Sequence, residues 1–167
     1  MATLGLEFKV DGRTFVQAKK KLRDMRERAG NVTAAWQVFM DWFTDGNRQQ
    51  FGTQGKRWRT PWRELKPKSL AQKRSDGWTG DILIRETTLM RSVTDRPMGL
   101  ERLGPHDMEA GTLVKYAAPH HFGAPRANLP ARPLWNVKQI KEEGAATSAV
   151  KTWITTGRAT VNARKSR

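Results

Sequence analysis

The chain has 167 residues and no cysteine, so it is long enough for one domain with a sizeable core and cannot form disulfides or thiolate metal sites. No apolar run approaches the roughly 20 residues of a membrane span, and the first residues lack the pattern of a secretory signal. We therefore expect a chain that stays in the cytosol or leaves it within a larger particle. The formal net charge of +15 is typical of a surface that faces a polyanion.

Two segments hold most of this charge. Residues 56–75 carry eight basic side chains and one acidic one, a net of +7, and residues 146–167 carry five basic side chains and no acidic one. Residues 76–145 are balanced, and residues 1–55 have a net charge of +3. The clustering indicates either a patch that meets nucleic acid or a basic surface that keeps the chain soluble.

The N-terminal third predicts a strand and two helices. Apolar residues alternate over residues 4–10, as in a strand. Over residues 15–29 they recur at helical spacing among lysines and arginines, and Gly30 would end this amphipathic helix. Asn31 suits the N-cap of a second helix, whose apolar stripe over residues 32–43 is expected to lie in the core.

Shorter elements are expected after residue 43. An irregular segment is followed by short helices and a β-hairpin; in chain order these are residues 44–66 (irregular), a helix over 67–74, a helix within 82–93, a hairpin over 99–116 with a Gly104-Pro105 turn, a helix over 133–143, and a helix or strand near 150–154. The pattern favours an α+β fold, in which a small, mainly antiparallel sheet is packed with several helices. We expect one domain over residues 1–156 and a flexible basic C-terminal tail over residues 157–167.

Residues 116–134 are predicted to form a long loop rich in proline and glycine. Its four prolines fix φ and remove backbone donors, so we expect that neither a helix nor a central strand runs through it. A loop of this length in a compact domain is usually functional. We interpret it as an interface loop, in which Phe122 and Trp135 anchor the base while Arg126 and Arg132 meet an adjacent subunit or the next ring of subunits.

The pair His120-His121 is the feature that best suits catalysis or metal binding. Adjacent residues on extended backbone point to opposite sides, so both histidines cannot easily bind one metal, and no zinc-like spacing is present. The sequence holds no nucleophile elbow, phosphate-binding loop or acidic nuclease cluster. We therefore expect neither an enzyme nor a cofactor, with one histidine at the base of the loop and the other facing solvent.

The tract Lys56-Arg-Trp-Arg-Thr-Pro-Trp-Arg-Glu-Leu-Lys-Pro-Lys68 interleaves basic side chains with Trp58 and Trp62. Its lysines and arginines suit contact with phosphates without readout of base sequence. Three environments are open to the two tryptophans: stacking on bases, a subunit or partner interface, or the core, with the basic side chains extending outward.

A resemblance to a protein family rests on the order and spacing of three stretches between residues 51 and 136. The first is Phe51-Gly-Thr-Gln-Gly-Lys-Arg-Trp58 with Trp62-Arg-Glu-Leu-Lys-Pro-Lys-Ser69. The second is Ile82-Leu83 with Thr87-Thr-Leu-Met-Arg-Ser92, and the third joins Tyr116-Ala117 to His120-His-Phe-Gly123 and Pro130-Ala-Arg-Pro133. Together they resemble the tail-completion (virion morphogenesis) proteins of tailed bacteriophages, with Thr88 at a position where that family has glycine.

This resemblance implies a structural virion protein, not an enzyme. It implies a homo-oligomeric ring, sixfold, at the head–tail junction, which joins the tail tube to the head and lets DNA pass. The expected partners are further copies of the chain, neighbouring neck, connector or tail-tube proteins, and duplex DNA bound without sequence preference, with no membrane. The expected locations are the neck or tail top of the virion and, during assembly, the host cytoplasm. The alternative is a non-specific nucleic-acid-binding module.

These arguments define two sets of candidate residues. The candidates for a subunit or partner interface are Trp58, Trp62, His121, Phe122, Arg126, Arg132 and Trp135. The candidates for a DNA channel are Lys56, Arg57, Arg59, Arg63, Lys66, Lys68, Arg164, Lys165 and Arg167.

Overall fold

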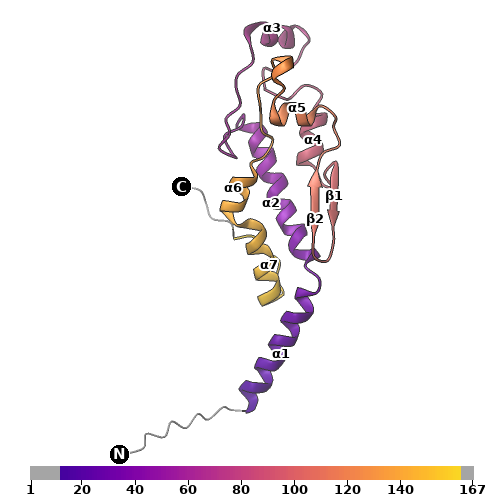
Figure 1. Cartoon of the computed structure of the whole chain (residues 1–167), viewed down its shortest axis with the longest axis vertical. Coiled ribbons are helices and arrows are strands. Elements are labelled where there is room, and N and C mark those ends of the chain that lie inside the picture. The colour runs from indigo at the N-terminus through magenta and orange to yellow at the C-terminus, as the bar shows by residue number, and fades with distance from the viewer. Residues whose placement is uncertain (1–11, 163–167) are drawn as a thin grey trace, which may run out of the picture.

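The computed structural model describes residues 12–162. The strand expected over residues 4–10 and the tail cations Arg164, Lys165 and Arg167 therefore lie outside the described residues. Within the described range the fold is α+β, as predicted, with several helices packed with a two-stranded antiparallel sheet (Figure 1). In chain order the elements are α1 (Gly12–Ala29), α2 (Thr33–Gly52), α3 (Pro67–Ser75), α4 (Thr88–Thr94), β1 (Leu100–Leu103), β2 (Met108–Gly111), α5 (Ala117–Phe122), a 3₁₀ turn (Pro125–Ala127), α6 (Val137–Glu143) and α7 (Ala145–Thr156).

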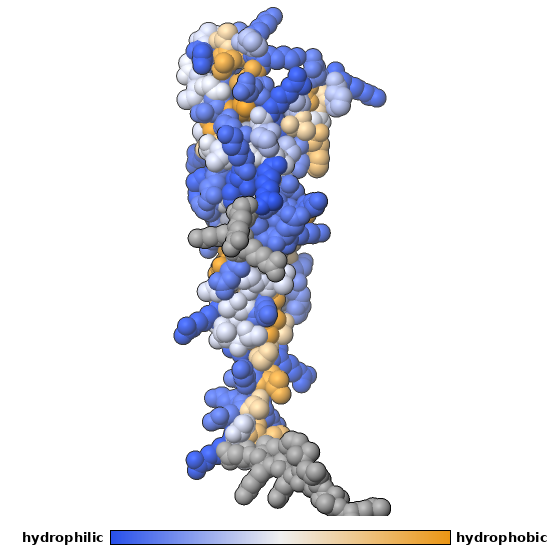
Figure 2. All heavy atoms as spheres, turned by 90° about the vertical axis from the view of Figure 1, so that its left-hand side faces the viewer, coloured by the Kyte–Doolittle hydropathy of each residue, from blue (hydrophilic) through white to orange (hydrophobic). Residues whose placement is uncertain are grey.

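α1 projects from the rest of the molecule (Figure 1). The helix forms where its amphipathic pattern predicts it, yet none of its residues is buried, and the side chains of Phe15 and Leu22 are 62% and 65% exposed. Its last turn is held by α7, where the Trp153 indole donates a hydrogen bond to the carbonyl oxygen of Arg28 at 3.3 Å. The described chain therefore leaves Phe15 and Leu22 uncovered, and apolar spheres are visible along this lower part of the molecule in Figure 2.

α2 is the central helix of the core, and its apolar stripe packs against α7, α4 and β1. The helix continues to Gly52, so the irregular segment predicted from residue 44 is wrong for its first part. Two polar residues extend the buried face because each is bonded inside. Asn47 Nδ2 donates to the carbonyl oxygen of Val93 at 3.0 Å, and Gln50 Nε2 donates to that of Pro133 at 2.9 Å.

β1 and β2 form the hairpin that the sequence predicts, with Leu100 opposite Gly111. The second strand was expected to reach Tyr116, but it ends at Gly111. The backbone N–H of Val114 donates to Thr112 Oγ1 at 3.1 Å, and this local bond turns the chain out of the sheet toward α5.

The helix expected within residues 82–93 begins only at Thr88. Leu83 and Thr87 have left-handed backbone, with φ of 60° and 58°, which a right-handed helix cannot contain. Residues 82–87 are instead an irregular segment, fixed at its start by a 2.7 Å hydrogen bond from the backbone N–H of Ile82 to Gln54 Oε1. This segment forms part of the pocket wall described below.

Two C-terminal helices complete the core. Pro133 does not begin a helix, because α6 starts after Asn136, whose Oδ1 caps it by accepting two backbone hydrogen bonds of 3.1 and 3.3 Å. Gly144, with φ of 64°, turns the chain into α7, which packs along α2. The last apolar set, for which helix and strand were both open, is thus helical, and the backbone N–H of Asn162 still contacts α7 at Ser148 Oγ (2.9 Å).

Candidate functional site

The tract of residues 56–68 follows α2 and is fixed by its two tryptophans. Trp58 is fully buried; its backbone N–H donates to Gln50 Oε1 at 2.9 Å and its indole N–H to Asn47 Oδ1 at 3.1 Å. Trp62 is also buried, and its indole N–H donates to the carbonyl oxygen of Pro133 at 2.8 Å. Both rings belong to the core, so their assignment to an interface is wrong: their polar atoms and faces are already used within the chain.

Arg57 is also held within the chain. Its guanidinium forms two hydrogen bonds to the Glu143 carboxylate, of 2.8 and 2.9 Å, and lies 4.1 Å from the centre of the Trp58 ring. Burial alone would raise the pKa of Glu143, but hydrogen bonds from Arg57 and Gln139 and the charge of Arg57 lower the pKa below its usual value. Arg57 was predicted to face DNA, and this is wrong because its charge is neutralised by Glu143.

The other cations of the tract extend into solvent; they are Lys56, Arg59, Arg63, Lys66 and Lys68. This is the outward arrangement expected when the tryptophans lie in the core. α1 provides a second basic surface, because its 18 residues include seven lysines or arginines and two acids, a net of +5. The net charge of residues 1–55 does not reveal the positive charge of α1, because acidic residues elsewhere in that range offset it. A sum over a window of one helix length would have revealed it.

The proline-rich segment contains the short helix α5, which the sequence did not predict, but no helix runs through the whole segment. Pro119 lies in the first turn of the helix, where a missing backbone N–H costs no helical hydrogen bond. His121 lies on this helix and packs against Trp135, with ring centres 5.2 Å apart, while its Nδ1 accepts a 3.2 Å hydrogen bond from the backbone N–H of Leu134. Trp135 in turn contacts Phe43 of α2, with ring centres 5.9 Å apart. His121 and Trp135 thus join the segment to the core.

Beyond α5 the loop folds back on itself and projects into solvent. Ala124 and Leu129 exchange two backbone hydrogen bonds of 2.9 and 3.1 Å. Gly123 permits this turn, because its φ is 83° and a Cβ there would lie 2.9 Å from the backbone nitrogen of Ala131. Phe122 was predicted to anchor the base of the loop with Trp135, and this is wrong for Phe122. Its side chain is 77% exposed, and Trp135 alone packs against the core. Arg126, at the 3₁₀ turn, is exposed as an interface residue must be.

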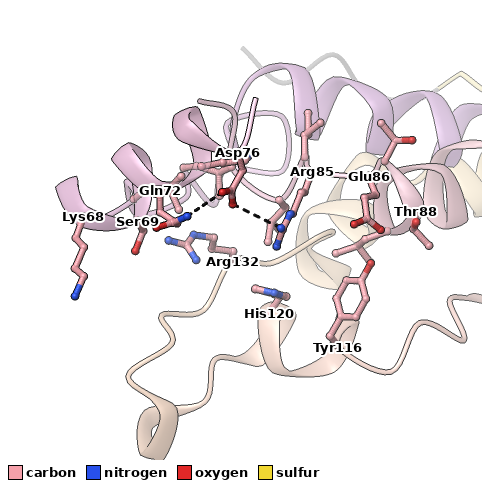
Figure 3. Close-up of a pocket in the computed structure, with 17 residues that line it drawn as sticks. Lys68, Ser69, Gln72, Asp76, Arg85, Glu86, Thr88, Tyr116, His120 and Arg132 are labelled. Atoms are coloured by element: carbon pink, nitrogen blue, oxygen red, sulfur yellow. Dashed lines mark hydrogen bonds and ion pairs between the residues drawn. The ribbon is translucent and has the colours of Figure 1, made fainter. Parts of the chain in front are cut away.

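A pocket of about 690 Å³ lies between α3, α5 and residues 82–89 (Figure 3). Its walls include leucine and isoleucine side chains from the tract and from residues 82–89, and polar side chains reach it from α3 and α5. Sequence patterns gave no sign of this pocket, because its walls come from four separate segments of the chain.

Arg132 lies in the pocket wall and is only 5% exposed. Its backbone N–H donates to the carbonyl oxygen of His120 at 2.7 Å, and its Nε donates to that of Arg63 at 3.1 Å. Burial and the charge of Arg63 lower the pKa of Arg132. Arg132 was predicted to meet an adjacent subunit or the next ring; because its side chain is buried in the pocket wall, a partner can reach it only through the pocket.

Both histidines of α5 are held in surroundings that disfavour their charged form. Burial, and then the charge of Arg132, lowers the pKa of His120, and burial lowers the pKa of His121. The Nδ1 atom of His120 is buried and has no hydrogen-bond partner in the described part of the chain. His120 therefore contributes an unsatisfied polar atom close to Arg132.

Over residues 12–162, no group of three or more histidine or carboxylate side chains is arranged to hold a metal ion. None of the helices described is long and apolar enough to cross a membrane. No protein-family model, curated protein or solved structure matches the chain. The contacts and surfaces above therefore carry the functional argument.

Proposed function

We propose that the protein is a structural virion protein of a tailed phage, which forms a ring at the head–tail junction, joins the tail tube to the head and lets DNA pass. The ordered stretches between residues 51 and 136 that resemble tail-completion proteins support this proposal. The same resemblance favours a sixfold ring. In this role the chain needs surfaces for its own copies and a basic wall for DNA, but no catalytic site.

The observation that carries the proposal is a pair of different apolar surfaces at opposite ends of the molecule. One is α1, with its exposed Phe15 and Leu22. The other is the segment around α5, where Leu113, Tyr116 and Phe122 are exposed. Figure 1 places α1 at the lower end and α5 near the upper end. Uncovered apolar side chains of this size commonly mark protein–protein contacts.

Two unlike surfaces favour a head-to-tail arrangement of subunits. A twofold dimer pairs one patch with itself, whereas contact between two different patches repeats from subunit to subunit and closes into a ring when the rotation permits. The exposed cations of the tract and of α1 then offer non-specific charge to DNA, which must slide and cannot be held by base contacts.

The test is the size and shape of the purified full chain. Light scattering coupled to gel filtration and electron microscopy of the particles should show a closed ring with a central channel. Leu22→Glu places a charge on the apolar face of α1 and should reduce the ring to monomers. Gln17→Glu adds the same charge to the opposite, polar side of the same helix and should leave the ring intact. A chain that is monomeric at every concentration, or a Leu22→Glu variant that assembles normally, would contradict the proposal.

A free nucleic-acid-binding module remains the second candidate, because both exposed basic surfaces would serve it. The two candidates differ in what the apolar surfaces do. If the chain binds DNA tightly as a monomer and Leu22→Glu leaves that binding unchanged, the module is favoured over the ring.

A further inference from the structure

Arg132 is a buried cation whose charge no carboxylate of the described chain neutralises. Its Nε is bonded to the carbonyl oxygen of Arg63, while its two terminal nitrogens have no partner within residues 12–162. Arginine presents these nitrogens as a planar fork that matches a carboxylate, and in a site with little water such a pair is stronger than on an open surface. In Figure 3 the guanidinium of Arg132 lies between α3 and His120, beside the pocket space.

Three charged side chains of the pocket, Lys73, Asp76 and Arg85, are engaged with other groups of the chain. Asp76 accepts a 2.8 Å hydrogen bond from Gln72 and forms an ion pair with Arg85 at 3.6 Å, as the dashed lines in Figure 3 mark. Lys73 donates to the carbonyl oxygen of Asp81. Within residues 12–162 the terminal nitrogens of Arg132 thus have no protein partner and are open to the solvent of the pocket, while the buried Nδ1 of His120 has no hydrogen-bond partner.

Part of the pocket wall is apolar, and part of its backbone is strained. Leu65, Ile82 and Leu89 are among the side chains that line it. Leu83 and Thr87, which also line it, hold left-handed backbone conformations that are costly for residues other than glycine. Such strain commonly occurs at binding sites, where the surrounding fold maintains it.

We propose that this pocket binds a carboxylate flanked by apolar side chains, which a peptide segment of a partner protein inserts. The carboxylate pairs with the terminal nitrogens of Arg132 in a two-point contact. The apolar side chains on either side of the acid cover the leucine and isoleucine walls. This charge complementarity identifies the partner segment as acidic and apolar, and the inference holds whether or not the chain forms a ring.

A DNA phosphate fits this pocket less well than an acidic peptide. The backbone of a duplex offers no apolar group to the leucine and isoleucine walls. The lining holds the cations Lys68, Lys73, Arg85 and Arg132 as well as the carboxylates Asp76 and Glu86, so its apolar walls, and not its charge, favour the peptide over DNA. The exposed cations of the tract are better placed for DNA because they stand in open solvent.

Three peptides that differ in one residue test the proposal on the full chain. They are acetyl-Leu-Glu-Leu-amide, its glutamine form and its phosphoserine form, with binding measured by calorimetry. The glutamate peptide should bind at least about tenfold more tightly than the glutamine peptide, because the charged two-point contact is lost in the latter. The phosphoserine peptide should bind more weakly than the glutamate peptide.

Variants of Arg132 locate the effect. Arg132→Met removes the charge and keeps the length, and it should make the glutamate and glutamine peptides bind equally. Arg132→Lys keeps the charge but removes the fork, and it should lose most of the preference, so this variant serves if Arg132→Met does not fold. Lys138→Gln removes an exposed cation outside the pocket and should leave the preference within about twofold of the native chain.

Each opposite result overturns the proposal. Equal binding of the glutamate and glutamine peptides by the native chain would show that the pocket does not recognise a carboxylate. Tighter binding of the phosphoserine peptide would show that the pocket recognises a phosphate instead. A preference that survives both Arg132 substitutions shows that the acid binds elsewhere. None of these results depends on the oligomeric state, so they are distinct from failure of the ring.

Discussion

Arg57 and Glu143 form a two-point ion pair between positions 86 residues apart in the sequence, with distances of 2.8 and 2.9 Å. The pair links the basic tract to the end of α6, and Gln139 Nε2 adds a 2.8 Å hydrogen bond to the same carboxylate. Glu143 has a side chain that is only 6% exposed, so it depends on these partners for the hydration it has lost. This pair therefore holds the tract to the C-terminal part of the core.

Removing Arg57 should destabilise the fold. Arg57→Ala leaves the buried Glu143 carboxylate with a charge that Gln139 cannot neutralise, and we expect a loss of about 3 kcal/mol in the free energy of unfolding. Lys56→Ala removes an exposed neighbouring cation and should change that free energy by less than about 0.5 kcal/mol. Denaturant unfolding of both variants measures the difference, and similar stabilities would show that the ion pair contributes little.

Two glycines of α2 should respond in opposite directions to alanine. At Gly46 a Cβ would lie 2.5 Å from Cζ2 of the buried Trp58, so Gly46→Ala should cost about 1–3 kcal/mol through overpacking. At Gly52 a Cβ meets nothing within 4 Å, so Gly52→Ala should be neutral or stabilise the helix by up to about 1 kcal/mol. Thermal unfolding of the two variants checks this, and equal effects would mean that Trp58 does not pack against Gly46.

Stability should fall as the pH decreases below about 6.5, the ordinary pKa of histidine. Burial lowers the pKa of His121 in the folded chain, so as the pH falls below 6.5 the unfolded chain binds a proton at this histidine before the folded chain does. The free energy of unfolding therefore decreases until the pH is below the pKa of His121 in the folded chain. His121→Asn retains a side-chain acceptor but does not titrate, so its stability should vary less between pH 7.5 and 5. Urea unfolding at both pH values gives the two slopes.

The expected change in slope for His121→Asn is partial, because the pKa of His120 is lowered as well. Glu101 and Glu143 contribute little at pH 5, because their ordinary pKa of 4.5 and their lowered pKa values in the fold both lie below that pH. A variant with the same pH dependence as the native chain would show that His121 is not held in its neutral form by the fold.

The protein should bind duplex DNA weakly, without sequence preference, and with an affinity that falls steeply as salt rises. Lys66→Gln and Lys68→Gln, in the exposed tract, should each reduce the slope of log affinity against log salt by about 1. Removing residues 163–167, with their three cations, should also reduce it. Lys151→Gln, an exposed cation on α7, is the control and should have little effect. Sequence-specific binding that survives high salt would favour the nucleic-acid module instead.

Local patterns in the sequence were enough to predict several elements. The apolar spacing of α1 and the first part of α2, the proline that begins α3 and the Gly104-Pro105 turn of the hairpin all predict structure within a few residues. These signals act over short distances, because helix periodicity, capping and turn chemistry depend on neighbouring residues. They were sufficient to identify the α+β class of the fold.

The same local signals could not show which polar residues are buried. Asn47 continues the spacing of the apolar stripe of α2, but its partner, the carbonyl of Val93, lies 46 residues away. Gln50 bonds to the carbonyl of Pro133 over 83 residues. Without these partners α2 looks as if it ends early, since amide side chains are rarely buried unless they are bonded.

The candidate site was decided by the tertiary structure in the same way. Composition alone marked the tract and the proline-rich segment as unusual, but it could not distinguish Arg57, which is neutralised by Glu143, from Lys56, which extends into solvent. Nor could it show that Arg132 is enclosed beside a pocket while Phe122 is exposed. The sequence determines which side chains are available, whereas their burial and charge partners depend on segments that only the folded chain brings together.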